Sequence, residues 1–316
     1  MGRYLAQRLL MIIPVMLGVT LLVFAMMHLA PGDPAVAMAG PRATPEQLTI
    51  IRHYLGLDRP LPTQYALWLE RAAVGDLGRS IRQGVPVTSL VLVDFRNSAL
   101  LAGVSFTLAT VLGIMAGLVA GLNRGSILDQ VIGFVSALGF STPAFFLGLL
   151  LIVLFAYKFP ILPIGGMHSV QGSSGLLDVA RHLVLPAITL AAVPTTVIAR
   201  TVRSSVLEIL GQDYIRTARA KGLREKMVIS RHILKNTLIP VITLLGLQAG
   251  FLLGGAAIVE VVFSYPGVGN LMIQSILERD LPVTQGCVLV LALVYVFVNL
   301  GADVLQCYLD PRIHFG

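Results

Sequence analysis

The sequence predicts an all-α, polytopic membrane protein with six transmembrane helices. Of its 316 residues 56% are hydrophobic and only 12% are charged. Soluble domains carry about 25% charged residues, so this chain could not cover its own surface in water. Long apolar runs also recur along the chain, and the basic residues lie between them. This distribution argues against nucleic acid as a partner despite the net charge of +7, because no exposed face collects the basic side chains.

Six apolar stretches have, or nearly have, the length of about 20 residues that a helix needs to cross a bilayer. They are Leu9–Leu29, Leu100–Leu122, Val131–Tyr157, Leu183–Ala199, Leu238–Val259 and Thr284–Val304. Pro186 and Pro194 interrupt the fourth stretch, which a spanning helix tolerates when neighbouring helices satisfy the freed carbonyls.

The first stretch could instead be a signal peptide. Arg3 and Arg8 precede it, and Ala-x-Ala patterns follow within 35–39. Its apolar run of about 20 residues exceeds the 7–15 of a signal peptide, which favours a retained span. The expected organisation is a tail and first helix over 1–30, an extracytoplasmic loop over 31–97, a transmembrane domain over 98–307 with a cytoplasmic coupling segment over 200–235, and a tail over 308–316.

Lysine and arginine counts in the short loops predict the orientation. With a cytoplasmic N-terminus, thirteen basic residues fall in the inner segments, nine of them between Arg200 and Lys235, and only three fall in short outer loops. The first loop, with seven arginines, is long enough to be exempt from this rule. Both termini are therefore expected in the cytoplasm.

The first loop is expected to form a small helical cap on the outer face; a solvated linker is the alternative. It opens with a turn signal, Pro31-Gly32-Asp33-Pro34. Thr44-Pro45-Glu46 then has the pattern of a helix start, and apolar residues follow at helical spacing through Leu55. Tyr65 and Trp68 suit a helix at the membrane interface.

The segment between the fourth and fifth spans predicts a short helix with defined ends. Asp213 can cap its first amides, and Gly222 can end it in the left-handed conformation. Arg219 and Lys221 fall in the last turn, where cations favour the helix dipole. A slim, basic helix of about two turns, kept narrow by alanine, could enter a groove on another protein. Contact with anionic lipid headgroups is the alternative.

This segment also resembles a known family. Asp213-Tyr214-Ile215-Arg216-Thr217-Ala218-Arg219-Ala220-Lys221-Gly222 is similar to the coupling-helix signature of ABC importer permeases of the dipeptide, oligopeptide and nickel class. That signature is often described as E-A-A, three residues, then G. Here Arg216-Thr217-Ala218 stands where E-A-A would, and Gly222 is in its place.

The resemblance covers nearly the whole chain. Its further motifs occur in order as Pro31-Gly32-Asp33-Pro34, Leu55-Gly56-Leu57-Asp58-Arg59-Pro60-Leu61, Gly75-Asp76-Leu77-Gly78, Ser141-Thr142-Pro143-Ala144-Phe145, Leu185-Pro186, Tyr265-Pro266-Gly267-Val268-Gly269 and Asp310-Pro311-Arg312. The pattern is most like the B-type subunit of dipeptide permeases. It implies the type I ABC importer permease fold, in a bacterial plasma (inner) membrane.

The resemblance further implies a subunit that forms half of a translocation path for short peptides. Its partners would be a second homologous permease subunit, two ATPase subunits or a fused pair, an extracytoplasmic substrate-binding protein and membrane lipid. ATP-Mg would bind to the partner ATPases, and no cofactor is expected in this chain. The residues agree, because a Walker A loop needs glycine before its lysine and none of the four lysines follows glycine. The chain is therefore not expected to be an enzyme.

Three further residues are candidates for the path. Glu260, at the outer end of the fifth span, could line it, although a solvated position near the interface is as compatible with the sequence. Gly250 and Gly254 belong to a set of small residues that also includes Gly246 and Gly255. Such spacing typically allows close helix packing, here against the partner permease, and lining the path is the alternative.

Other functions fit less well. A secondary transporter usually has internal repeats and mid-membrane ionisable residues, and an intramembrane enzyme needs a catalytic motif; neither is evident here. No metal site is expected, because no Cys-x-x-Cys or His/Cys cluster occurs. Glutathione and nickel chelates remain alternative substrates.

Overall fold

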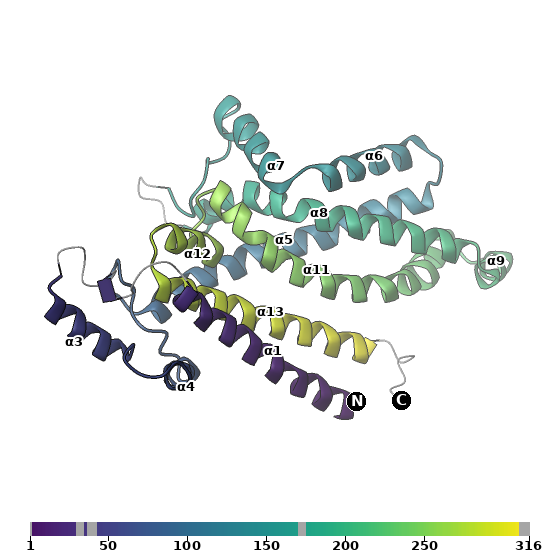
Figure 1. Ribbon diagram of the computed structural model, residues 1–316. Coiled ribbons are helices and arrows are strands. Elements are labelled where there is room, and N and C mark those ends of the chain that lie inside the picture. Colours follow the sequence, from purple (N-terminus) through teal and green to yellow (C-terminus); the bar gives the residue numbers. More distant parts are fainter. Residues whose placement is uncertain (1, 30–34, 37–42, 170–174, 310–316) are drawn as a thin grey trace. The chain divides into compact units, whose positions relative to one another are not determined.

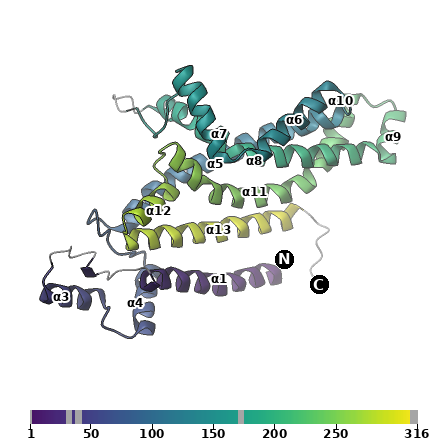
Figure 2. The ribbon, with the colours of Figure 1, turned by 45° about the horizontal axis from the view of Figure 1, so that its top comes forward.

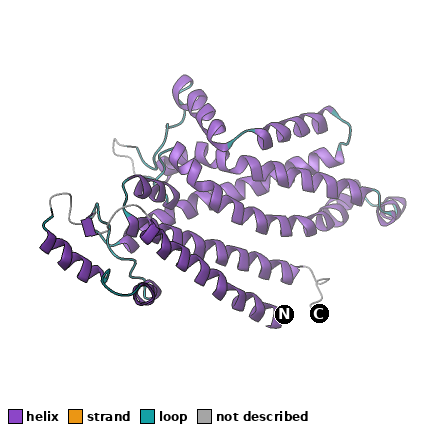
Figure 3. Ribbon diagram, in the orientation of Figure 1, coloured by secondary structure: helices purple, strands orange, loops and turns teal. Residues whose placement is uncertain are grey.

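The computed structural model describes residues 2–29, 35–36, 43–169 and 175–309, and these are almost entirely helical (Figures 1 and 3). Over these ranges no strand forms, and an isolated antiparallel bridge joins Arg79 to Pro86. The chain divides into two compact units. The first unit contains Ala99–Tyr265 and Phe297–Gly316, and the second contains Gly2–Ser98 and Pro266–Val296.

The described helical elements follow one another along the chain in a fixed order. They are α1 (Gly2–Leu29), α3 (Pro45–Leu55), α4 (Leu61–Ala73), α5 (Val87–Leu122), α6 (Ile127–Ser141), α7 (Ala144–Leu151), the π-helical η1 (Ile152–Lys158), α8 (Leu176–Leu210), α9 (Asp213–Ala220), α10 (Glu225–Met227), the π-helical η2 (Val228–Leu234), α11 (Lys235–Val262), α12 (Val268–Leu277) and α13 (Leu281–Leu309).

The all-α membrane fold is confirmed. Within the described residues, four helices are long and apolar enough to cross a membrane: Val87–Leu122, Leu176–Leu210, Pro240–Val262 and Leu281–Val304. The pair α6 and α7–η1 meets the same test as one broken span, and α1 adds a shorter apolar stretch, Leu10–Met26. Each of the six predicted stretches is thus helical over most of its length.

The third predicted span, Val131–Tyr157, is not one straight helix. The helix direction bends by 108° between its two halves (Figure 2). Pro143 lies at the break and has no amide hydrogen to continue the helix. The ring also disfavours helical backbone at the residue before it, and Thr142 is accordingly extended, with φ −87° and ψ 121°.

The fourth span behaves in the opposite way. Pro186 and Pro194 lie inside α8, which continues for 35 residues and extends beyond the predicted Leu183–Ala199 at both ends. Both prolines are buried, and 67% of the apolar window of α8 is covered by the rest of the chain. Neighbouring helices therefore surround α8, which is the setting in which prolines are tolerated in a spanning helix.

Glycines bring α5 and α8 into close contact in the first unit. A Cβ atom on Gly113, Gly117 or Gly121 would lie within 2.8 Å of atoms of α8. At Gly117 the nearest atom, at 2.5 Å, is the backbone carbonyl oxygen of Ala199, which no rotamer change can move. Small residues at this four-residue spacing allow two helix backbones to approach closely.

The second unit contains the cap, and the expected helical cap is confirmed. Thr44 caps α3: its hydroxyl accepts the Gln47 amide and the Gln47 side chain accepts the Thr44 amide. α4 packs on α1, where the Thr20 and Tyr65 hydroxyls lie 2.9 Å apart. The motifs 31–34 and 310–312 lie outside the described residues.

A buried carboxylate fastens the loop after the cap to the start of α13. Asp280, 3% exposed, accepts hydrogen bonds from the Ser80 hydroxyl and from the amides of Ile81 and Arg82. Beside it, Gly286 lies so close to Val87 that a Cβ atom would be 2.5 Å from the valine side chain. The second unit therefore has a well-packed interior of its own.

Candidate coupling site

The predicted coupling helix exists as α9, at the end of α8 (Figure 1). Gly211 and Gln212 make the turn between the two helices. The cap residue is Gln212 rather than the expected Asp213, which is the first residue inside the helix. Its carboxylate lies 3.5 Å from the Arg216 guanidinium and makes no capping bond. A negative charge in the first turn still favours the helix dipole.

The predicted end of α9 at Gly222 is confirmed. Gly222 has a φ of +76°, in the left-handed region that favours glycine. Its amide donates to the Arg219 carbonyl at 2.9 Å, and the Leu223 amide donates to the Ala218 carbonyl at 3.4 Å. This pair of bonds is a Schellman motif, which satisfies carbonyls that the helix end would leave free. The C-terminal end of α9 is therefore fixed by its own backbone hydrogen bonds.

One face of α9 is buried against its own chain. Ile215 is fully buried and Ala218 is 7% exposed, and they join a core that includes Val206 of α8 and Val228 and Ile233 of η2. Ala218 therefore packs inward, which corrects the expectation that it keeps the helix slim for a partner. Its small size instead lets α9 lie close to the platform formed by α8 and η2.

The opposite face of α9 is exposed and polar. Asp213, Arg216, Thr217 and Ala220 follow one another at helical spacings of three, four and seven residues, and all four are exposed. The small residue available to a partner on this face is Ala220. The face has no large apolar side chain, so lipid tails are an unsuitable cover for it.

Flanking side chains are held in place around this face. Arg219 makes a bidentate pair with Glu225 through bonds of 3.2 and 2.7 Å, and the Tyr214 hydroxyl accepts from the Asn236 amide at 3.3 Å. The hydrogen bond from Arg219 lowers the pKa of Glu225 and raises that of Arg219. The pair joins the end of α9 to α10, so the helix is braced from outside as well as from its core.

An ion pair joins the start of α6 to α8. The Asp129 carboxylate accepts from Arg203 Nε at 2.6 Å and Nη2 at 2.9 Å, and from the Gly125 amide at 3.0 Å. Sequence reasoning missed this contact because Asp129 and Arg203 are 74 residues apart. The only local signal was Ser126, which caps the helix that Asp129 enters.

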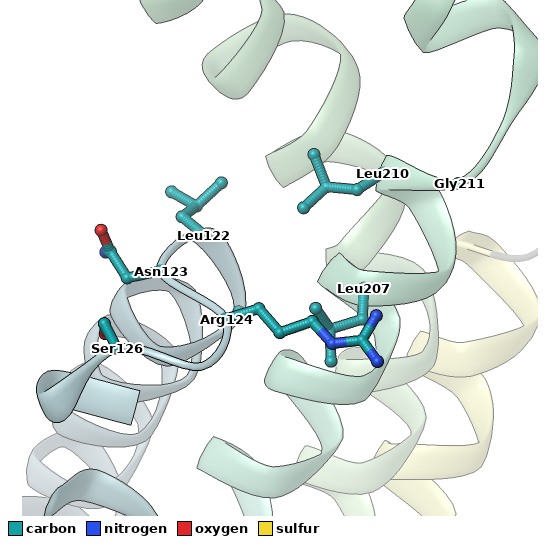
Figure 4. Close-up of a pocket in the computed structure, with 8 residues that line it drawn as sticks. Leu122, Asn123, Arg124, Ser126, Leu207, Leu210 and Gly211 are labelled. Carbon is teal, nitrogen blue, oxygen red and sulfur yellow. The ribbon is translucent and has the colours of Figure 1, made fainter. Parts of the chain in front are cut away.

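A cavity of about 470 Å³ opens beside this ion pair and the turn into α9 (Figure 4). The α5–α6 turn contributes Asn123, Arg124 and Ser126, and the end of α8 contributes Leu207, Leu210 and Gly211. Figure 4 shows the Arg124 side chain extending toward Leu207. The cavity therefore lies next to the turn that leads from α8 into α9.

The residues predicted to line the translocation path, Glu260, Gly250 and Gly254, belong to α11 and not to α9. Glu260 is fully buried, so a solvated position is wrong. Gly250 is buried and Gly254 is exposed with open space in front of its Cα. Gly246 faces Ala302 of α13 in the same chain, not the partner permease that was expected. No group of three or more potential metal ligands occurs in the part of the chain that the structure describes.

Comparison with known families gives two matches. "Binding-protein-dependent transport system inner membrane component" matches residues 109–315, and the N-terminal component of the same transport systems matches residues 1–92. Together these matches cover almost the whole chain.

Several curated relatives are similar over nearly their full length. The chain is 39% identical to the dipeptide transport system permease protein DppB of Escherichia coli K12, with 99% of both chains covered. It is 41% identical to the di/tripeptide transport system permease protein DppB of Pseudomonas aeruginosa, with 98% of both covered. It is 40% identical to the glutathione transport system permease protein GsiC of Escherichia coli O6:H1, with both fully covered.

Solved structures share the fold at low identity. The inward-facing MetNI methionine ABC transporter matches with a TM-score of 0.58 at 17% identity, over 70% of this chain and 96% of that one. An amino acid ABC transporter matches with a TM-score of 0.52 at 16% identity, over 72% and 95%. The chain thus belongs to the binding-protein-dependent transport system inner membrane component family, as a multi-pass permease of an ABC importer.

Proposed function

We propose that this protein forms half of the translocation path of an ATP-driven importer of short peptides, with α9 as the element that receives the force of ATP hydrolysis. The observation that carries the proposal is the two-sided structure of α9. Ile215 and Ala218 hold one face to the core, while Asp213, Arg216, Thr217 and Ala220 present the other face to solvent. Substrate class rests on similarity to dipeptide and di/tripeptide permeases.

The proposed partners are a second homologous permease subunit, two ATPase subunits or a fused pair, and an extracytoplasmic binding protein. ATP-Mg binds to the ATPases. This chain lies in the inner membrane, with both termini in the cytoplasm. Closure of the ATPases moves α9, and the move passes to α8 through the two-residue turn. The close α5–α8 contact at the α5 glycines then transmits this movement to α5, and the Asp129–Arg203 pair transmits it to α6. Differential contacts in the two states supply the free energy of the switch.

Ala220→Trp tests the docking role. An indole on the exposed face of α9 blocks close approach of an ATPase without disturbing the core. Peptide uptake in proteoliposomes is expected to fall at least about tenfold, while basal ATP hydrolysis and the thermal stability of the chain stay unchanged; tenfold corresponds to about 1.4 kcal/mol. Ala218→Trp is the contrasting variant, because it overpacks the buried face and lowers stability.

Normal uptake by Ala220→Trp would contradict docking through this face. Purification of the chain from its native membrane in mild detergent gives an independent test, since ATPases and a second permease should accompany it. Glutathione is the second candidate substrate, on the strength of the 40% identity to a glutathione permease. Uptake of labelled dipeptide, glutathione and nickel chelate by the same proteoliposomes separates the three.

A further inference from the structure

A second cavity, of about 440 Å³, lies within the second unit. Its walls come from α1, from the cap and from the first turn of α13. Phe24, Trp68 and Leu281 are among its apolar lining residues, and Arg59, Arg71 and Arg79 are its arginines. The volume is within the range of about 300–1,000 Å³ that is typical of small-molecule sites. The coupling site in the first unit uses none of these residues.

The three arginines form no ion pair with any residue that the structure describes. The one acidic residue that lines the cavity is Asp76, and one of its oxygens accepts the Gly78 amide at 3.0 Å. Three guanidinium groups against one carboxylate leave an excess of positive charge in a partly enclosed space. Such an excess attracts an anion, and arginine binds phosphate and carboxylate in a bidentate manner.

The two glutamine amides and the histidine around the cavity have partners within the chain. The Gln64 amide nitrogen donates to the carbonyls of Leu57 and Arg59, and the Gln285 amide nitrogen donates to the Val23 carbonyl. His53 is paired with Asp58 at 2.8 Å, outside the arginine group. The arginines are therefore the groups left to bind a ligand.

The surroundings of the cavity have the composition of a membrane interface. Phe24, near the outer end of the apolar stretch of α1, packs on Tyr65 and Trp68, with ring centroids 5.4 and 6.2 Å away. Aromatic clusters of this kind collect at the membrane–water interface. Below them, α1 exposes Leu10, Leu17 and other apolar side chains along its length, as a lipid-facing helix does.

We propose that this cavity binds the phosphate headgroup of an anionic phospholipid from the extracytoplasmic leaflet. Arg59, Arg71 and Arg79 contact the phosphate, and Trp68 and Phe24 pack against the glycerol and the first methylenes of the acyl chains. The bound lipid fastens the cap to the outer ends of α1 and α13. The choice of leaflet rests on the orientation proposed above, whereas the lipid site itself does not depend on the transported substrate.

The first test compares lipid retention. The whole transporter is purified from its native membrane with the triple variant Arg59→Gln, Arg71→Gln, Arg79→Gln, and bound phospholipid is quantified by extraction and mass spectrometry. The matched control, Arg52→Gln, Arg82→Gln, Arg96→Gln, removes the same charge from residues that do not line the cavity. Anionic phospholipid per complex is expected to fall about tenfold relative to the control. Equal retention in both variants would overturn the proposal.

The second test uses the unaltered protein, so it does not depend on the variant folding. The delipidated transporter is heated with phosphatidylglycerol, phosphatidylcholine, inorganic phosphate or a dipeptide, and its melting temperature is recorded. Phosphatidylglycerol alone is expected to stabilise it. Equal stabilisation by inorganic phosphate would indicate a free-anion site, and stabilisation by dipeptide alone would indicate a cargo site; each excludes the lipid. Co-purification of ATPases, which tests the coupling role, is unaffected by any of these outcomes.

Discussion

Two helices of the first unit, α8 and α11, pack against each other but differ in how much of their surface the chain itself covers. The apolar window of α8 is 67% buried and that of α11 only 22%. α8 is held on several sides, by α5, α6, α7 and α11, whereas α11 exposes apolar side chains such as Leu247, Phe251 and Ile258. The difference shows that α8 is enclosed by its own chain, while α11 keeps an apolar face that lipid or the proposed second permease could cover.

The largest effect is expected at the α5–α8 contact. Gly117→Leu places a side chain 2.5 Å from a backbone oxygen of α8, and overpacking of this kind costs about 3 kcal/mol or more. The protein should lose most of its folded yield and melt at a much lower temperature in detergent. Gly103→Leu is the control, because nothing lies within 4 Å of a Cβ atom there and that helix position is exposed. Similar behaviour of the two variants would show that α5 and α8 do not pack tightly.

A smaller loss is expected from Arg203→Met. The change leaves the carboxylate of Asp129, whose side chain is only 8% exposed, without its cation. Thermal unfolding should occur at lower temperature than in the parent protein. The double variant Arg203→Met, Asp129→Asn removes both charges and should recover part of the loss. A double variant no better than Arg203→Met would mean that the pair contributes by packing rather than by charge.

Gly254→Leu tests whether the exposed face of α11 binds the proposed second permease. Gly254 is exposed and faces open space, so the isolated chain should fold and melt unchanged. Association with the second permease, measured by co-purification at graded protein concentration, should weaken about tenfold, or about 1.4 kcal/mol. Unchanged association together with unchanged uptake would assign this face of α11 to lipid.

The smallest effect is expected at the Arg219–Glu225 ion pair, which joins α9 to α10. Glu225→Gln removes the exposed pair with Arg219, and such pairs contribute about 0–1 kcal/mol and less at high salt. Because the folded protein lowers the pKa of Glu225, the contribution is present at neutral pH and is lost as pH falls through that lowered value. Melting temperatures of parent and variant should therefore converge at acid pH and at high salt. A difference that grows in acid would contradict the ion pair.

The sequence predicted the coupling segment better than its orientation. Gly222 marked the end of α9 because only a left-handed residue can close a helix in this way. Asp213 was expected at the cap, yet the helix begins one residue earlier than that role requires, with Gln212 at the cap. Ala218 was expected to face a partner, yet it packs inward. Local chemistry determines where a helix stops, whereas tertiary packing determines which side faces the core.

The prolines also show that tertiary packing cannot be read from the local sequence. Pro186 and Pro194 are tolerated within the fourth span, as expected, while Pro143, for which no break was expected, divides the third span. The residue type is identical, so the outcome depends on surroundings: α8 is enclosed by other helices, whereas much of the surface of α6 and α7 is exposed. The Asp129–Arg203 pair could not be predicted from the local sequence either, because neither segment contains a signal that identifies the other as its partner.

The break at Pro143 has a consequence for water. Ahead of it the carbonyl of Gly139 lacks its helical donor, because residue 143 has no amide hydrogen, and behind it the first amides of α7 lack carbonyls. Hydrocarbon offers such groups no hydrogen bonds, and each group left without a partner there costs several kcal/mol. Acyl chains therefore cannot cover this bend. At membrane depth, the backbone around Pro143 must meet other helices of this chain, another protein chain or water.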